Sequence, residues 1–271
     1  MPELPEVETT LRGIHPFVMN AKLTAVKVRN PSLRWPIPVT ELELLVGQQI
    51  VQATRRAKYI LLRFDSATVI LHLGMSGSLR VLEKELEPQK HDHVDLVLND
   101  EKILRFNDPR RFGCLLLTHG DPGAHKLLAH LGPEPLDDSF DADYLFKQSR
   151  KRNVPVKNFI MQGQVVVGVG NIYASEALFL AGVRPMRVAR KVTQKEYSKL
   201  VESIKFVLQR SIDMGGTTLR DFTRVDGQAG YFKQKLQVYD RFEQPCHECD
   251  AAIKKVVIGQ RSSFYCPKCQ R

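Results

Sequence analysis

The chain has 271 residues, of which 43% are hydrophobic and 26% are charged, a composition typical of a soluble globular protein with a core and room for more than one domain. It has no run of about eighteen apolar residues, which excludes a helical membrane protein, and its first residues lack the basic and apolar regions of a signal peptide. Forty Lys and Arg residues against thirty Asp and Glu residues give a net charge of +10, which fits a polyanionic partner such as nucleic acid.

The start of the chain carries a candidate nucleophile. Pro2 is small enough to permit removal of Met1, which would leave Pro2 with a free secondary amine. Because α-amino groups titrate near about 7.7–8.0, a useful fraction of that amine is neutral at physiological pH and can attack a carbonyl-type carbon to give an iminium ion. Glu3 follows directly and could move protons. The alternative is that Pro2 only starts the chain, while Pro5 and Glu6 open a helix.

The first half of the chain predicts a β-sandwich. A helix is expected from Val7 to Ile14, where Gly13 helps to close it. Short alternating or β-branched segments with turn signals between them follow, and many short strands at this spacing indicate a sandwich. The expected strands are Leu23–Val28, Ile50–Ala53, Tyr59–Phe64, Thr68–Leu73, His93–Leu98, Ile103–Phe106 and Phe112–Thr118. Two prolines in the run Leu131–Leu136 then predict a linker.

Beyond this linker the apolar period changes to 3.6, which predicts helices. The expected helices are Ala142–Ser149, Val156–Met161, Asn171–Ala181 and Thr193–Met214. Thr193 is a suitable N-cap for the longest of them, and Gly215 with Gly216 ends it. The polar, glycine-bearing stretch from Thr217 to Gly230 predicts a mobile loop.

The run Val165–Ala174 contains Gly-x-Gly-x-x-Ala after a strand-like segment, which invites comparison with a dinucleotide-binding fingerprint. That fingerprint opens a βαβ unit, but Pro185 lies in a segment that would make a poor central strand. A tight turn between two helices fits better. Its backbone N–H groups would then meet a phosphate, with Asn171 adding a side-chain donor.

Four of the five cysteines form two Cys-x2-Cys pairs separated by sixteen residues: Cys246 with Cys249, and Cys266 with Cys269. This spacing predicts one structural Zn²⁺ held by four thiolates. Two disulfides are a poor alternative in a cytosolic setting, and four protein ligands leave no open position for a catalytic water. Between the pairs, Ile253–Ile258 and Ser262–Tyr265 predict a hairpin. Arg261 lies at or beside its tip, either as a ligand-binding group or as an ordinary solvated arginine.

Three features together resemble a known family. They are the opening Met-Pro-Glu-Leu-Pro-Glu-Val-Glu-Thr, the run Gly168–Ala174 and the terminal four-cysteine cluster. In this order over the whole chain they resemble formamidopyrimidine-DNA glycosylase, a bifunctional base-excision repair enzyme for oxidised purines. The related endonuclease VIII proteins typically begin with Pro-Glu-Gly-Pro-Glu, which this chain does not.

The resemblance implies a multi-domain α+β fold. Residues 1–131 would form a catalytic β-sandwich domain with flanking helices, residues 137–237 a helical helix–two-turns–helix domain that binds DNA, and residues 238–271 a zinc-ribbon hairpin. One departure stands at Gln162, where the family usually has an aspartate. This difference puts local helix capping in doubt.

The same resemblance implies a reaction. Pro2 would attack C1′ of an everted nucleotide and form a Schiff base, and Glu3 would move protons around the sugar. Lys58 would donate a proton during β-elimination, and Arg261 would grip the flanking phosphates and assist the second, δ-elimination. No redox or nucleotide cofactor is implied.

Eversion of a base leaves a void in the duplex that something must fill. The resemblance assigns this task to Met75, Arg110 and Phe112, with Arg110 facing the orphaned cytosine; apolar wedges of this kind unstack base steps. From the residues alone, Met75 would be core and Phe112 a strand residue. The resemblance further implies that His91 contacts a phosphate and that Arg152 makes another DNA contact.

His91, Asp92 and His93 also suggest metal ligands, but no third partner is evident, so His93 is expected to be a structural strand residue. The expected partner is damaged double-stranded DNA, without a membrane, and the protein would act as a monomer in the cytoplasm or on the nucleoid of a bacterium. Two alternatives stay open. One is an endonuclease VIII-like preference for oxidised pyrimidines, and the other is a non-catalytic zinc-ribbon protein that only binds DNA.

Overall fold

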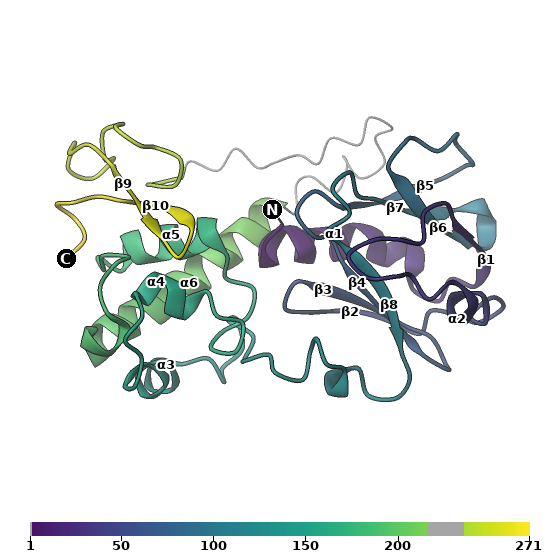
Figure 1. The fold of residues 1–271 in the computed structure, drawn as a ribbon, viewed down its shortest axis with the longest axis horizontal. Helices are drawn as coiled ribbons and strands as arrows, with labels where there is room; N and C mark the ends of the chain where they lie inside the picture. The colour runs from purple at the N-terminus through teal and green to yellow at the C-terminus, as the bar shows by residue number, and fades with distance from the viewer. Residues whose placement is uncertain (1, 216–235) are drawn as a thin grey trace. The chain divides into compact units, whose positions relative to one another are not determined.

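The computed structural model describes residues 2–215 and 236–271, so the predicted mobile loop Thr217–Gly230 lies outside the described residues. The chain divides into two compact units (Figure 1). The first contains residues 2–129 and the end of the long helix from Ile212; the second contains residues 130–211 and 236–271.

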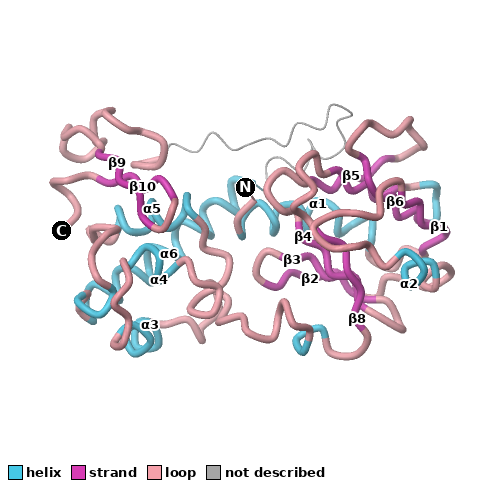
Figure 2. The backbone as a smooth tube through the Cα atoms, in the orientation of Figure 1, coloured by secondary structure: helices cyan, strands magenta, loops and turns pink. Residues whose placement is uncertain are grey.

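The first unit contains two four-stranded antiparallel sheets, in agreement with the predicted sandwich (Figure 2). One sheet has the order β2 (Gln52–Arg56), β3 (Tyr59–Arg63), β4 (Thr68–His72) and β8 (Cys114–Thr118). The other has the order β1 (Leu23–Val28), β6 (Asp92–Leu98), β7 (Ile103–Asn107) and β5 (Ser78–Leu82). Short helices connect strands at α2 (Val39–Glu43), η1 (Asn99–Glu101) and η2 (Pro122–Ala124).

One apolar cluster joins both sheets to helix α1 (Leu4–Val18). The helix contacts β2 and β3 of one sheet and β5 of the other, and runs alongside both (Figure 1). Ile14 and Val18 on this helix are fully buried. The sandwich therefore positions the start of α1 by burying the rest of the helix.

Helix α1 is longer at both ends than the predicted Val7–Ile14, and Gly13 does not close it. Pro16 lies inside the helix, where it removes one backbone donor. The fully buried Val18 shows why the helix continues: its last turn gains apolar burial that offsets the lost hydrogen bond. A capping box at its start, described below, begins the helix at Leu4.

The sequence analysis missed β5, although Leu79 and Val81 alternate there with more exposed residues. It also missed the short helix α2. The predicted strand Phe112–Thr118 begins only at Cys114, because Arg111 has a φ of +56° and the N–H of Gly113 donates to the carboxylate of Asp108. Phe112 is therefore a loop residue.

The second unit is helical, with a terminal hairpin. Its elements are α3 (Ala142–Ser149), α4 (Val156–Ile160), α5 (Asn171–Leu180), η3 (Ala189–Lys191), α6 (Gln194–Gly215), β9 (Lys254–Ile258) and β10 (Arg261–Tyr265). Thr193 caps α6 as predicted, since its hydroxyl accepts the N–H of Glu196, whose carboxylate accepts the N–H of Thr193 at 2.8 Å. No helix in the described residues is both long enough and apolar enough to cross a membrane.

The predicted linker is irregular, as expected, but it is anchored to the second unit. The N–H of Gly132 donates to the carbonyl oxygen of Gly163 at 2.7 Å, and the N–H of Val167 donates to that of Pro133 at 3.2 Å. The strand-like run Val165–Val167 is buried and forms turns between α4 and α5. This confirms the turn between two helices and excludes the βαβ reading of the glycine run.

A buried ion cluster holds the sheet that contains β6. The fully buried guanidinium of Arg105 donates to both carboxylate oxygens of Asp95 at 2.8 Å, and to Asp92 at 3.4 Å. It also donates to the carbonyl oxygen of Leu86 at 3.0 Å, which ties down the β5–β6 loop. Burial alone would raise the pKa of Asp95, but hydrogen bonds from Arg105 and Arg29 hold that pKa below its usual value.

Because the pKa of Asp95 is lower in the folded state than in the unfolded chain, its contribution to stability is present above the unfolded pKa of about 3.9 and is lost as the pH falls through the folded pKa. We expect Asp95→Asn to lower the free energy of unfolding at pH 7 by about 3–5 kcal/mol, the usual cost of removing one partner of a buried ion pair. The difference from the parent should shrink as the pH falls below about 4. Urea unfolding at pH 7 and pH 3 measures both.

The matched control is Glu85→Gln, because Glu85 forms an exposed ion pair with Lys27. This variant should leave the unfolding free energy unchanged, since solvent screens such pairs. An Asp95→Asn protein as stable as the parent at pH 7 would contradict the assignment.

Candidate active site and nucleic-acid interface

The start of α1 holds the proposed nucleophile. Glu3 is 1% exposed and is the N-cap of the helix. Its N–H donates to the carboxylate of Glu6 at 2.8 Å, as half of a capping box. Pro2, which is half-buried, directly precedes it. The terminal dipeptide is therefore held against a helix whose N-terminal dipole also favours the Glu3 carboxylate.

Lys58 lies in the two-residue turn between β2 and β3, where Ala57 has a φ of +55°. Arg55 in β2 donates to the carboxylate of Glu8 in α1 at 2.8 Å and to the carbonyl oxygen of Ala57 at 2.9 Å. Burial raises the pKa of Glu8, but hydrogen bonds from Arg55 and Arg12 lower it overall, so Glu8 stays ionised at neutral pH. One ion pair thus joins the helix that begins after Glu3 to the turn that carries Lys58.

Met75 lies in the loop between β4 and β5, and Arg110 and Phe112 lie in the loop between β7 and β8. Phe112 is 47% exposed, and the guanidinium of Arg110 stacks over its ring at 4.9 Å. Phe112 lies before β8 and is not a strand residue, and half-buried Met75 is not a core residue either. The two loops offer an apolar and cationic tip suited to insertion between bases.

His91 is half-buried in the turn before β6. His93 is 4% exposed, and its Nε2 donates to the carbonyl oxygen of Asp108 at 2.8 Å. The structural assignment of His93 is therefore confirmed. Within residues 2–215 and 236–271, the four cysteines are the group of side chains that could hold a metal ion, and His91 and His93 form no such group.

In the second unit, Asn171 begins α5 and is hydrogen-bonded to the hairpin. Its amide Nδ2 donates to the carbonyl oxygen of Ser262 at 3.1 Å, and its Oδ1 accepts from Lys157 Nζ at 2.6 Å. Lys157, only 1% exposed, also donates to the hydroxyl of Ser263 at 2.6 Å. Arg261 directly precedes Ser262, so this cluster holds the start of β10 against the start of α5.

Sequence analysis missed Lys157. The signal was present, because a lysine three residues before the buried Ile160 falls on the apolar face of the predicted helix. A lysine on such a face is buried only with partners. Here its partners are Asn171 and β10.

The tip of the hairpin presents Arg261 as predicted. Gly259 and Gln260 have φ values of +54° and +63°, which is the requirement of a tight two-residue hairpin turn. A Cβ on Gly259 would lie 2.5 Å from the side-chain amide of Asn158, so the tip packs against α4. Arg261 is the first residue of β10 and is exposed.

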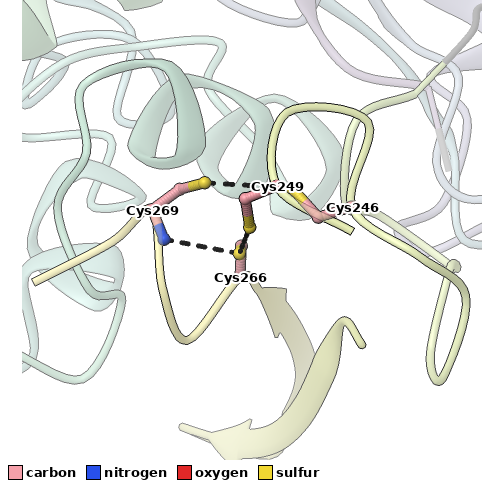
Figure 3. Close-up of side chains that lie close together, drawn as sticks. All are labelled: Cys246, Cys249, Cys266 and Cys269. Atoms are coloured by element: carbon pink, nitrogen blue, oxygen red, sulfur yellow. Dashed lines mark hydrogen bonds between the residues drawn. The ribbon is translucent and has the colours of Figure 1, made fainter. Parts of the chain in front are cut away.

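The four cysteines of the C-terminal module come together as predicted (Figure 3). Their sulfur atoms all lie within 4.8 Å of one another, with Cys249 and Cys266 at 3.4 Å and Cys246 and Cys269 at 3.9 Å. Tetrahedral Zn²⁺ with bonds of about 2.3 Å places its sulfur ligands about 3.8 Å apart, so the site fits the ion. The module therefore holds one structural zinc.

A second buried polar contact anchors this module. The carboxylate of Glu176 in α5 accepts the backbone N–H groups of Gln237, Val238 and Tyr239 at 2.7, 3.0 and 2.9 Å. Burial raises the pKa of Glu176 although these donors act to lower it. Sequence analysis missed this residue, because nothing in its helix indicates a partner sixty residues away.

Arg152 is exposed in the loop before α4, and its role as a DNA contact stays a prediction. The guanidinium of its neighbour Arg150 makes contacts within the second unit. The guanidinium of Arg150 donates to the carbonyl oxygen of Val192 at 2.9 Å and lies 3.8 Å from the centre of the Phe146 ring.

Gln162, the departure from the family pattern, lies in the first turn after α4. Its carbonyl oxygen accepts the N–H groups of Val165 at 2.8 Å and Val166 at 3.2 Å. Main-chain hydrogen bonds therefore hold this turn, and they do not depend on the side chain at position 162.

Three family models match the chain in order. They are the formamidopyrimidine-DNA glycosylase N-terminal domain at residues 1–115, the H2TH domain of the same enzymes at residues 131–223, and the zinc finger found in FPG and IleRS at residues 243–271. Curated formamidopyrimidine-DNA glycosylases from Thioalkalivibrio sulfidiphilus and Methylococcus capsulatus are each 55% identical over 271 residues, covering 100% of both chains.

Solved structures of formamidopyrimidine-DNA glycosylases have the same fold as this chain. The MutM (Fpg) protein from Thermus thermophilus is 37% identical, with a TM-score of 0.85 over 99% of this chain and 98% of that one. Lactococcus lactis Fpg in complex with an abasic site containing DNA is 28% identical, with a TM-score of 0.88 over 99% of each chain. A MutM in complex with carbocyclic 8-oxo-G containing DNA is 30% identical, with a TM-score of 0.87 over 100% of each chain. Identity over the full length, three domain models in order and one shared fold show that this chain belongs to the formamidopyrimidine-DNA glycosylase family.

Proposed function

We propose that this protein excises oxidised purines from double-stranded DNA with Pro2 as its nucleophile. It is a DNA glycosylase of base-excision repair with AP-lyase activity, as its family membership shows. The observation that carries the assignment of the nucleophile is the position of Pro2, directly before the buried N-cap Glu3 and at the end of a helix anchored in the sandwich.

In the proposed reaction the Pro2 nitrogen forms a bond to C1′ of the everted nucleotide, and the C1′–base bond breaks. The sugar ring opens to an iminium ion while Glu3 supplies and removes the protons. Lys58 then assists β-elimination of the phosphate on one side, and Arg261 assists δ-elimination on the other. Hydrolysis of the iminium releases the enzyme. Met1 must be removed first, because an amide nitrogen is not a nucleophile.

Binding of DNA is assigned to the basic and polar groups of both units. The net charge of +10 supplies a general attraction to phosphate. We assign phosphate contacts to His91, Arg152, Asn171 and Arg261. Asn171 donates one amide N–H to Ser262, and its second N–H is the proposed donor to phosphate.

The preference for purines rests on relatives. The opening of this chain differs from the endonuclease VIII pattern, and one relative was solved with 8-oxo-G containing DNA. The same proposal includes the domain boundaries at residues 1–131, 137–237 and 238–271, and association with the bacterial nucleoid.

A blocked amine should abolish the reaction. Protein whose N-terminus is acetylated, or which retains Met1, is expected to give no borohydride-trapped adduct with abasic DNA and to leave lesion-bearing DNA uncut. Processed protein should give a covalent adduct. Intact mass spectrometry identifies each form. Blocked protein that still cuts at the full rate would contradict the role of Pro2.

The lesion preference has a direct test. We expect faster cleavage of a duplex with 8-oxoguanine opposite cytosine than of a duplex with thymine glycol, measured by single-turnover gel assay. The reverse order would instead support the endonuclease VIII-like specificity. Tight binding to both duplexes with neither cleavage nor adduct would support a protein that only binds DNA.

Removal of zinc should abolish DNA binding before it alters the first unit, because the metal staples the module that presents Arg261. Cys249→Ser is expected to lose zinc and at least about tenfold in DNA affinity by fluorescence anisotropy, on the order of one phosphate contact. The matched control is Cys114→Ala, which lies in β8 outside the cluster and should keep both. Unchanged affinity in the Cys249→Ser protein would contradict the role of the module.

A further inference from the structure

We infer that Asp108 is the positioning residue that joins the two loops of the proposed wedge, so that Met75, Arg110 and Phe112 enter DNA as one rigid body. This inference rests on the proposed function, in which these side chains fill the void left by the everted base. The two loops are residues 73–77, between β4 and β5, and residues 108–113, between β7 and β8; together they are called the wedge loops below.

The carboxylate of Asp108 bridges the wedge loops. Its side chain is fully buried. One oxygen accepts the hydroxyl of Ser76 at 3.1 Å and the N–H of Arg110 at 3.3 Å, and the other accepts the N–H of Gly113 at 2.7 Å. A buried carboxylate is stable only when donors of this kind surround it. Ser76 therefore supplies a cross-loop link, while Arg110 and Gly113 supply links within one loop.

The backbone of Asp108 makes a third connection. Its N–H donates to the carbonyl oxygen of His91 at 3.0 Å, and its carbonyl oxygen accepts from Nε2 of His93 at 2.8 Å. The turn that carries the proposed phosphate contact His91 is thus attached to the same residue. Asp108 therefore connects both wedge loops to the turn that carries His91.

The backbones of the wedge loops also touch. Gly74 has a φ of +65°, and a Cβ there would overlap the N–H of Gly113. The N–H of Gly74 donates to Nδ1 of His72 at 2.9 Å. Burial and the charge of Lys58 lower the pKa of His72 to about 4, so its ring is neutral at physiological pH and Nδ1 can accept this hydrogen bond. The close approach of Gly74 to Gly113 therefore packs one loop directly against the other.

A rigid wedge has an energetic advantage. Unstacking a base step and everting a nucleotide already cost free energy, and ordering two mobile loops would add to the barrier. With the loops joined before DNA arrives, binding energy is not spent on ordering them. The exposed Phe112 ring, stacked under Arg110, is then presented in a single orientation.

The test separates eversion from chemistry. Stopped-flow fluorescence of 2-aminopurine beside 8-oxoguanine reports eversion, and single-turnover cleavage of preformed abasic DNA reports Pro2 chemistry. We expect Ser76→Ala to slow eversion about tenfold, the equivalent of one hydrogen bond to a charged group, and Asp108→Ala to slow it further. The loss on abasic DNA should be smaller for both variants.

The matched controls are Ser66→Ala and Asp121→Ala. Ser66 donates to Gln48 on the surface, and the Asp121 carboxylate accepts the N–H of Gly123 in an exposed turn. Both variants should evert the base at the parental rate. Thermal unfolding of all four variants shows which of them are folded.

Two further readouts distinguish positioning from a general structural defect. Placing the lesion opposite a gap makes eversion easier and should restore most of the rate to Ser76→Ala. In a Met75→Ala, Phe112→Ala background, Ser76→Ala should have little additional effect, because the wedge it orients is gone. Additive losses, or no rescue by the gapped substrate, would overturn the inference.

The outcomes also separate this inference from the proposed function. If the parent protein forms no adduct with abasic DNA, the proposed function fails. If the parent reacts but Ser76→Ala and Asp108→Ala both evert the base at the parental rate, only the inference fails. Should Asp108→Ala not fold, Ser76→Ala decides alone, because it keeps both links within residues 108–113.

Discussion

The proposed chemistry of this protein depends on one constraint: the proposed nucleophile is the end of the chain, yet it must be held as firmly as a residue of the core. Chain ends are usually the least ordered part of a domain. Here the capping box of Glu3 and Glu6 begins α1 one residue after Glu3, and Leu4 is fully buried immediately inside it. The sandwich fixes the helix, and the helix fixes Glu3, which Pro2 directly precedes.

Buried polar side chains order other exposed segments in each unit. Loops that face DNA cannot bury enough apolar surface to order themselves, so hydrogen bonds to buried groups hold them. Asp108 collects donors in the first unit, while Lys157 and Glu176 join α4 and α5 to the C-terminal module in the second. Each such group needs all its partners, because an unsatisfied buried charge is costly. We therefore expect the proposed DNA interface to be sensitive to residues that do not contact DNA themselves.

Much of this could be predicted from the sequence, and the reason differs from feature to feature. The four zinc ligands and the turn between two helices are local patterns. The cysteine pairs and the turn before Asn171 were therefore predicted directly from the sequence. Strand β5 was missed although Leu79 and Val81 alternate as a strand requires. The length of α1 was missed because tertiary burial of Val18 outweighs the local effect of Pro16.

The buried polar groups could not be predicted, because their partners are distant in sequence. Lys157 and Ser263 are 106 residues apart, and Glu176 and Val238 are 62 apart. Asp108 and Ser76 are only 32 residues apart in the sequence, but they lie in two different loops. A single sequence shows which residues are polar, but only the fold shows which of them meet.

The burial of Cys114 has a consequence for a protein that works where oxidants are damaging DNA. Its thiol is 1% exposed, and burial raises its pKa to about 11, so almost none of it is thiolate, the form that peroxide attacks. The other four cysteines are the zinc ligands. Oxidation of cysteine would therefore begin at the zinc module, with release of the metal and loss of the proposed phosphate contact of Arg261, while the amine of Pro2 stayed intact.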